Sequence, residues 1–154
     1  MQRSAHIRLV SPRIFYVVIL PIVGIVLTIG VVASTFSFAI VGSSSMSPTL
    51  TKGDVLLWTP AEITDIAIGD IVVYKSSTCW PDEKMVVHRV VETKCDGEGF
   101  ILLETRGDAN GWVDQEKTHL SEPYIDSGHI MGKVVCFGSQ PVKIPFVGMI
   151  GLWF

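Results

Sequence analysis

The chain has 154 residues, 48% of them hydrophobic, and its 12 basic and 15 acidic side chains give a formal net charge of −3. That length suffices for one domain with an appendage, and the acidic balance argues against a nucleic-acid-binding protein, which would need a basic face. The three cysteines include no Cys-x-x-Cys pair, which argues against a disulfide framework or a metal site. Cys79 and Cys95 flank one predicted hairpin, and they either pair in an oxidising compartment or stay free and buried.

The first predicted element is a transmembrane helix. Residues 14–42 contain no charged side chain, and a helix of about 20 apolar residues crosses a bilayer. We therefore expect a helix from about Ile14 to Thr35, within an anchor at residues 14–36. A cleaved signal peptide is the competing interpretation, because Ser37-Phe38-Ala39 has the small-x-small pattern of a cleavage site. The apolar region is about twice as long as a usual signal-peptide core, which favours the anchor.

The charges before the anchor predict its orientation. Arg3, Arg8 and Arg13 precede it, and the first acidic residue of the chain is Asp54. The positive-inside rule then places residues 1–13 in the cytosol and the rest of the chain outside. In a eukaryotic cell, that outside would be the lumen of the endoplasmic reticulum.

Residues 37–140 are predicted to form a compact, mainly β domain. Short runs rich in Val, Ile and aromatic residues alternate with turn residues, as is typical of strands. The predicted strands are Asp54–Trp58, Ile71–Lys75, Met85–Glu92, Phe100–Glu104 and Ile130–Phe137. Gly-Asp pairs before the first two strands indicate turns, and the only helical signal after the anchor is a weak one at residues 60–66.

The C-terminal segment, residues 141–154, reads PVKIPFVGMIGLWF. Its 14 residues are apolar, but they are too few to span a bilayer and include two prolines. The segment lies at the membrane surface, begins a second span, or completes the core of the domain.

A serine cluster follows the anchor, at residues 43–45 of VGSSSMSPTL. A serine hydroxyl becomes a good nucleophile only beside a base. His6 precedes the anchor, and His119 and His129 lie in turn-rich sequence, which leaves His88 in the strongest predicted strand. Alternation along that strand puts His88 on one face with Val86 and Val90. A structural histidine with both nitrogens hydrogen-bonded remains the alternative.

An aspartate loop follows the next strand. Residues 105–116, TRGDANGWVDQE, contain Asp108 and Asp114, either of which could orient a histidine base. Gly-Asp-Ala-Asn is also an ordinary turn sequence, in which an aspartate is often structural. The residues alone thus predict a serine cluster, a strand histidine and an aspartate loop in that order, without deciding for an enzyme.

Five segments in this order resemble the boxes of type I signal peptidases, and the resemblance extends over residues 14–150. They are Ser43-x-Ser45-Met46-x-Pro48-Thr49-Leu50 with Gly53-Asp54, Gly69-Asp70-Ile71-Val72-Val73-Tyr74, His88-Arg89-Val90, Gly107-Asp108-x-Asn110 with Asp114, and Gly132-Lys133-Val134 with Pro145-x-x-Gly148. Bacterial members have a lysine where this chain has His88, so the chain is similar to the archaeal and endoplasmic-reticulum branch. Ala109 departs from that branch, because eukaryotic members have asparagine there.

The resemblance implies a role for each site residue. Ser45 would be the nucleophile and His88 the general base, since an ordinary imidazole titrates near neutral pH. Asp114 is favoured as the acid that orients His88, while Asp108 is its rival or holds the serine region. The backbone amide of Ser45 and the hydroxyl of Ser43 would stabilise the oxyanion.

Substrate binding is also implied. The signal peptide would bind as an added strand on a domain edge, with small side chains in pockets near Met46, Val86 and Val90. No metal or cofactor is expected.

The expected function is therefore that of a membrane-bound serine endopeptidase that cleaves signal peptides from exported preproteins. About ten residues separate the anchor from Ser45, which places the cut close to the outer membrane surface. The expected partners are signal peptides, the bilayer, and the translocon or subunits of a signal peptidase complex. A repressor-type self-cleaving protease is disfavoured, because it would need a lysine at position 88 and no anchor. A non-catalytic anchored β module, either a pseudoenzyme or a secretion accessory protein, is the remaining alternative.

Overall fold

The computed structural model describes residues 12–76, 84–115 and 124–149. The chain divides into two compact units, Met1–Thr35 and Phe36–Phe154. Among the described residues, the first unit contains one helix and the second contains the strands.

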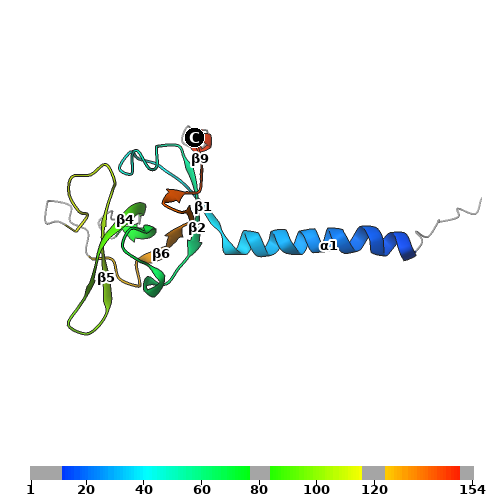
Figure 1. Cartoon of the computed structure of the whole chain (residues 1–154), viewed down its shortest axis with the longest axis horizontal. Coiled ribbons are helices and arrows are strands. Elements are labelled where there is room, and N and C mark those ends of the chain that lie inside the picture. The colour runs from blue at the N-terminus through cyan, green and yellow to red at the C-terminus, as the bar shows by residue number, and fades with distance from the viewer. Residues whose placement is uncertain (1–11, 77–83, 116–123, 150–154) are drawn as a thin grey trace, which may run out of the picture. The chain divides into compact units, whose positions relative to one another are not determined.

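Helix α1 (Pro12–Thr35) runs without interruption through its 24 residues, Pro21 included (Figure 1). A rise of 1.5 Å per residue makes it about 36 Å long, and the hydrocarbon core of a bilayer is about 30 Å thick. Its segment Phe15–Thr35 has a mean hydropathy of 2.7 and is not covered by the rest of the described protein. The predicted helix is thereby confirmed as a candidate transmembrane span.

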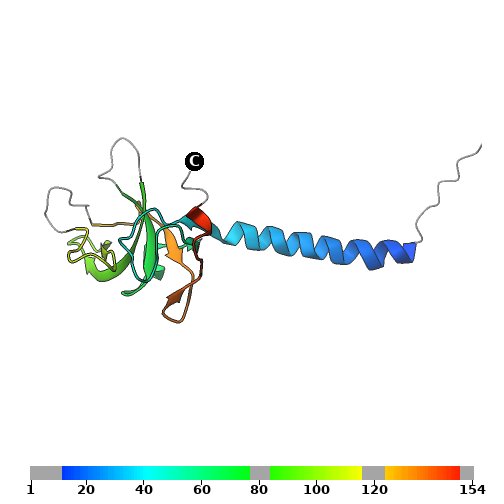
Figure 2. The same ribbon diagram turned by 90° about the horizontal axis from the view of Figure 1, so that it is seen from above.

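The second unit is built on an antiparallel sheet of seven strands. Its order is β1-β2-β6-β3-β4-β5, and β9 pairs with Val55 and Leu56 of β2 on the edge opposite β1. These strands are β1 (Ser37–Ile40), β2 (Val55–Pro60), β3 (Ile71–Ser76), β4 (Lys84–Cys95), β5 (Ile101–Arg106), β6 (Ile130–Val134) and β9 (Lys143–Ile144). A small hairpin of β7 (Cys136–Phe137) and β8 (Gln140–Pro141) projects beyond β6 (Figure 2). Ile63–Asp65 and Val147–Met149 each form one turn of 3-10 helix.

Strand β3 lies between two apolar clusters, because its side chains alternate between the faces of the sheet. Ile71 and Val73 pack with residues of β1, β2 and the serine region, including Met46 and Leu50. Val72 and Tyr74 of the same strand pack in a second cluster. The second cluster also contains Ile63, Ile66, Val90, Leu103 and Ile125. The uninterrupted apolar run of β3 is therefore explained by burial on both faces.

The mainly β fold and the five predicted strands are confirmed, with two differences. The predicted strand Ile130–Phe137 divides into β6 and β7, and the weak helical signal at residues 60–66 corresponds to the turn Ile63–Asp65. The sequence did not indicate β8 and β9 as strands, and β9 brings the start of the apolar C-terminal segment into the sheet.

The structure also corrects the expectation that the cysteines are buried. Cys95 is free and exposed rather than buried, and Cys136 is also free and exposed. Cys79 lies outside the described residues, as do His6 and His119.

Candidate active site

Ser45 lies in the loop between β1 and β2, which we call the serine loop (residues 41–54). Met46 and Leu50 are buried in the core at 1% and 0% exposure, and the amide of Leu50 donates to the carbonyl of Met46 at 2.9 Å. These contacts make the serine loop a packed turn and not a flexible linker. They leave Ser45 itself partly exposed.

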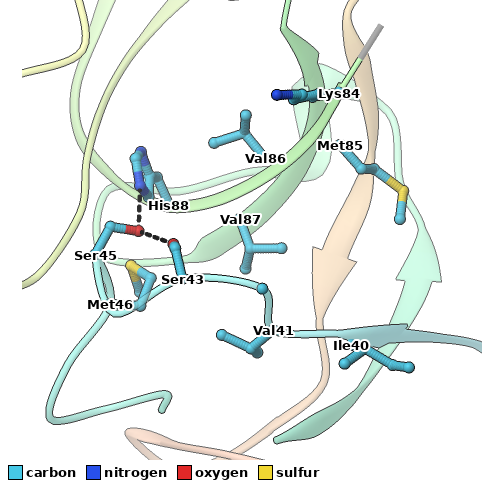
Figure 3. A pocket seen from close by; sticks show the side chains of 11 residues that line it. Ile40, Val41, Ser43, Ser45, Met46, Lys84, Met85, Val86, Val87 and His88 are labelled. Carbon is cyan, nitrogen blue, oxygen red and sulfur yellow. Dashed lines mark hydrogen bonds between the residues drawn. The ribbon is translucent and has the colours of Figure 1, made fainter. Parts of the chain in front are cut away.

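His88 lies in the middle of β4, with its side chain only 11% exposed. Its Nε2 is 2.9 Å from Oγ of Ser45, and its Nδ1 is 2.5 Å from Oδ2 of Asp114. The Oγ atoms of Ser43 and Ser45 are 3.1 Å apart (Figure 3). Ser45, His88 and Asp114 therefore form a continuous chain of contacts.

Asp114 is held by the end of β5. The loop that follows β5 folds back, so that the amide of Asp114 donates to the carbonyl of Thr105 at 2.8 Å. Oδ2 of Asp114 also accepts hydrogen bonds from the Thr105 hydroxyl at 2.8 Å and from the Tyr74 hydroxyl at 3.2 Å.

Asp108 contacts a different partner. Its Oδ1 accepts from Nε of Arg89 at 2.8 Å, and its Oδ2 accepts from Nη2 of Arg89 at 2.7 Å and from the Thr49 hydroxyl at 2.5 Å. The hydrogen bonds from Arg89 hold the pKa of Asp108 below its usual value and outweigh the opposite effect of burial. Of the two aspartates in this loop, Asp114 meets the histidine and Asp108 meets the serine loop.

Gly107 lies at the contact between the aspartate loop and the serine loop. A Cβ at this position would lie 2.6 Å from the carbonyl oxygen of Ser45 and 3.0 Å from Nε2 of His88. The amide of Ala109 donates to that same carbonyl of Ser45 at 2.8 Å. Glycine is thus required for the aspartate loop to approach the serine loop this closely.

A cavity of about 550 Å³ opens beside Ser45 and His88 (Figure 3). One wall is the stretch 40–46, and the other is the first part of β4, residues 84–88. Met46 and Val86 line it, whereas Val90 is fully buried in the core and does not.

The first part of β4 also has an open edge. Residues 84–88 pair with β3, but the pairing of β4 with β5 begins only at Arg89. No other described strand pairs with residues 84–88 on that side.

Comparison with known proteins gives the family. Residues 13–96, which include Ser45 and His88, match the family described as signal peptidase, peptidase S26. The chain belongs to this family. The signal peptidase complex catalytic subunits of Verticillium alfalfae, Pyricularia oryzae and Colletotrichum graminicola are 33%, 34% and 35% identical to it over 112 residues. Each match covers 72% of this chain, and the chain spans 59% of the length of these relatives.

The other described histidine of this signal peptidase family member makes a separate contact. His129 bonds Asp126 through Nδ1 at 2.7 Å, at the turn before β6. Within residues 12–76, 84–115 and 124–149, no group of three His, Cys, Asp or Glu residues is arranged to bind a metal ion.

A second ion pair supports the serine loop from the C-terminal side, and sequence reasoning missed it. Asp54 is fully buried, and its Oδ2 accepts from Nζ of Lys143 at 2.6 Å. Lys143 also donates to the carbonyl of Thr49 at 3.0 Å. Burial raises the pKa of Asp54, but hydrogen bonds from Lys143, Thr51 and the amide of Phe146 together hold it below its usual value.

Proposed function

We propose that this chain is a membrane-bound serine endopeptidase that cleaves signal peptides from exported preproteins. The contact chain from Ser45 through His88 to Asp114, beside an open cavity, is the observation that carries the proposal. Membership of the signal peptidase family supports the same activity.

The proposed reaction uses the two nitrogens of His88 for different tasks. We assign the neutral tautomer with its proton on Nδ1, where it is donated to Asp114. Nε2 then accepts the hydroxyl proton of Ser45 as Oγ attacks the scissile carbonyl carbon, and the same proton passes to the leaving amine when the peptide bond breaks. A water molecule follows the same route to hydrolyse the acyl-enzyme, which regenerates the serine.

The oxyanion would form near the start of the serine loop. No described residue accepts a hydrogen bond from the backbone amide of Ser45, so this donor is available to the substrate. The Ser43 hydroxyl, next to Oγ of Ser45, is the second proposed donor. Removal of one such donor typically costs about 3 kcal/mol of transition-state stabilisation.

We assign Asp108 a supporting role. Its carboxylate joins Arg89 of β4 to Thr49 of the serine loop. The hydrogen bonds of Asp108 would therefore keep the nucleophile at a fixed distance from His88 without touching the reacting atoms.

The substrate is proposed to bind as an extended strand. Residues 84–88 offer an unpaired edge that leads to His88, and main-chain hydrogen bonds along such an edge would hold a peptide in register. Side chains of the peptide would alternate in direction, so that small residues before the cut enter the cavity beside Met46 and Val86.

The proposed location follows from the anchor and its flanking charges. Residues 1–13 would be cytosolic, residues 14–36 would span the bilayer, and the catalytic domain, residues 37–140, would face the outside or the lumen of the endoplasmic reticulum. Residues 141–154 would associate with the membrane surface. Signal peptides, the translocon and subunits of a signal peptidase complex are the proposed partners.

Cleavage of a preprotein in membranes that carry the full chain tests the proposal. Ser45→Ala, His88→Ala and Asp114→Ala should each lose cleavage, whereas Ser44→Ala, a neighbouring and exposed serine, should retain it. Full cleavage by Ser45→Ala would overturn the proposed mechanism. Failure of Ser45 to react with an acylating probe would favour the non-catalytic anchored module.

A further inference from the structure

We propose that Tyr74 and Thr105 are positioning residues for catalysis, which fix the carboxylate of Asp114 and tune the basicity of His88 through it. This inference rests on the proposed mechanism in which Asp114 orients His88. Neither residue touches the substrate or the reacting atoms, so both would act only through Asp114.

Three hydrogen bonds converge on one oxygen. Oδ2 of Asp114 accepts from Nδ1 of His88 at 2.5 Å, from the hydroxyl of Thr105 at 2.8 Å and from the hydroxyl of Tyr74 at 3.2 Å. Tyr74 and Thr105 are both fully buried, at 0% exposure. A buried hydroxyl that donates to a carboxylate makes a stronger hydrogen bond than one between neutral groups.

The sheet register explains why these side chains meet. Val72 of β3 pairs with His88, and Tyr74 lies two residues further along β3, on the same face. On the other side of β4, Thr105 of β5 pairs with Val90, which is two residues from His88. Three adjacent strands thus present the imidazole, the phenol and the hydroxyl on one face, where Asp114 contacts all of them.

The Thr105 hydroxyl is itself oriented toward Asp114. Oε1 of Gln115 accepts a hydrogen bond from the amide of Thr105 at 2.8 Å, and Nε2 of Gln115 lies 3.5 Å from the Thr105 hydroxyl, to which it donates. A hydroxyl has one hydrogen, and with Gln115 as a donor its shortest available acceptor is Oδ2 of Asp114.

Two consequences follow for His88. The hydroxyl donors fix the plane of the carboxylate, so that Oδ2 faces Nδ1 and the proton stays on that nitrogen. The same hydroxyl donors also draw part of the negative charge of the Asp114 carboxylate toward themselves, and that charge is what stabilises the imidazolium. Loss of one donor should leave more negative charge on the Asp114 carboxylate facing His88, which favours the imidazolium and moves the acidic limb of activity to higher pH.

The ionisable groups around this cluster are few. His88, Asp114 and Tyr74 are the ionisable side chains joined within it. Arg89 lies on the opposite face of β4 and pairs with Asp108. Besides His88, the ionisable side chain among the residues that line the neighbouring cavity is that of Lys84.

The test is the pH profile of kcat/KM for cleavage of a signal-peptide substrate by the full chain in detergent. Tyr74→Phe and Thr105→Val should each lower kcat/KM about tenfold and move the acidic limb upward by about half a pH unit. Thr105→Ser, which keeps the hydroxyl, should restore the wild-type profile. The matched controls are Tyr124→Phe and Thr93→Val, which lie outside this cluster and should leave the profile unchanged.

The outcomes separate this inference from the mechanism on which it rests. Unfolding of each variant is followed over the same pH range, and the limbs are compared only where every variant stays folded, so that a shifted limb does not come from instability. An unmoved limb in both Tyr74→Phe and Thr105→Val, together with loss of activity in Asp114→Asn, would overturn this inference and leave the triad in place. Wild-type activity in Asp114→Asn would instead overturn the proposed role of Asp114 itself.

Discussion

Asp108→Asn should loosen the serine loop and destabilise the domain. In the native protein the Asp108 carboxylate accepts two hydrogen bonds from Arg89 and one from Thr49. The amide that replaces it is neutral and presents an NH2 group in place of one oxygen. One of the three donors would therefore face another donor, and Arg89 would lose its counter-ion.

The magnitude follows from the geometry and the burial. A hydrogen bond to a charged group contributes about 1.5–3 kcal/mol, and breaking a buried ion pair costs about 3–5 kcal/mol. The side chains of Asp108 and Arg89 are 17% and 28% exposed, so solvent screens part of their interaction. We expect the free energy of unfolding to fall by about 2–3 kcal/mol. Cleavage should fall at least tenfold, because Thr49 is in the same loop as Ser45.

Denaturant unfolding of the detergent-solubilised full chain measures the first effect, with tryptophan fluorescence, to which the buried Trp58 contributes, as a probe. Preprotein cleavage at a denaturant-free reference condition measures the second. Glu92→Gln is the control, because Glu92 makes an ion pair at 53% exposure, where the expected loss is below about 1 kcal/mol. Equal unfolding midpoints for Asp108→Asn and the wild type would refute the reasoning that Asp108 clamps the loop.

Gly107→Ala should abolish preprotein cleavage, because the new Cβ would lie 2.6 Å from the carbonyl oxygen of Ser45; Gly111→Ala, whose Cβ meets no atom within 4 Å, should cleave like the wild type. Lys143→Met should lower the free energy of unfolding by about 3 kcal/mol, because it leaves the buried carboxylate of Asp54 without its cation. Since the folded-state pKa of Asp54 is below its usual value, the wild type should lose stability as the pH falls below about 4. Melting temperatures across that range should show a smaller loss in Lys143→Met, and an equal loss would contradict this assignment.

The predictable parts of the fold are those with a local signal. Helix α1 has an apolar run without charge, and β3 is an apolar run because both of its faces are buried. Strand β1 (Ser37–Ile40) has no such signal, since it continues the apolar composition of the helix before it. Strand β9 (Lys143–Ile144) has two residues, and its pairing with β2 depends on the tertiary fold.

The candidate site likewise has one part that the sequence predicts and another that depends on the tertiary fold. Residue chemistry predicted a serine, a histidine and an aspartate loop, but Asp108 and Asp114 are six residues apart in one loop, and either could have met the histidine. Only the folded loop distinguishes them, through the hydrogen bond that returns Asp114 to Thr105. The contact of Tyr74 with Asp114 was likewise unpredictable, because it joins residues 40 positions apart.

The two residues at the centre of β4 connect these observations. His88 and Arg89 are adjacent, so they point to opposite faces of the strand. His88 bonds Asp114 and Ser45, while Arg89 bonds Asp108, which in turn bonds Thr49 of the serine loop. The serine loop is therefore tied to β4 on both faces, directly at His88 and, at Arg89, through Asp108 of the loop that follows β5. Because a shift of β4 by one residue would exchange the two faces, the register of this strand determines whether the site forms at all.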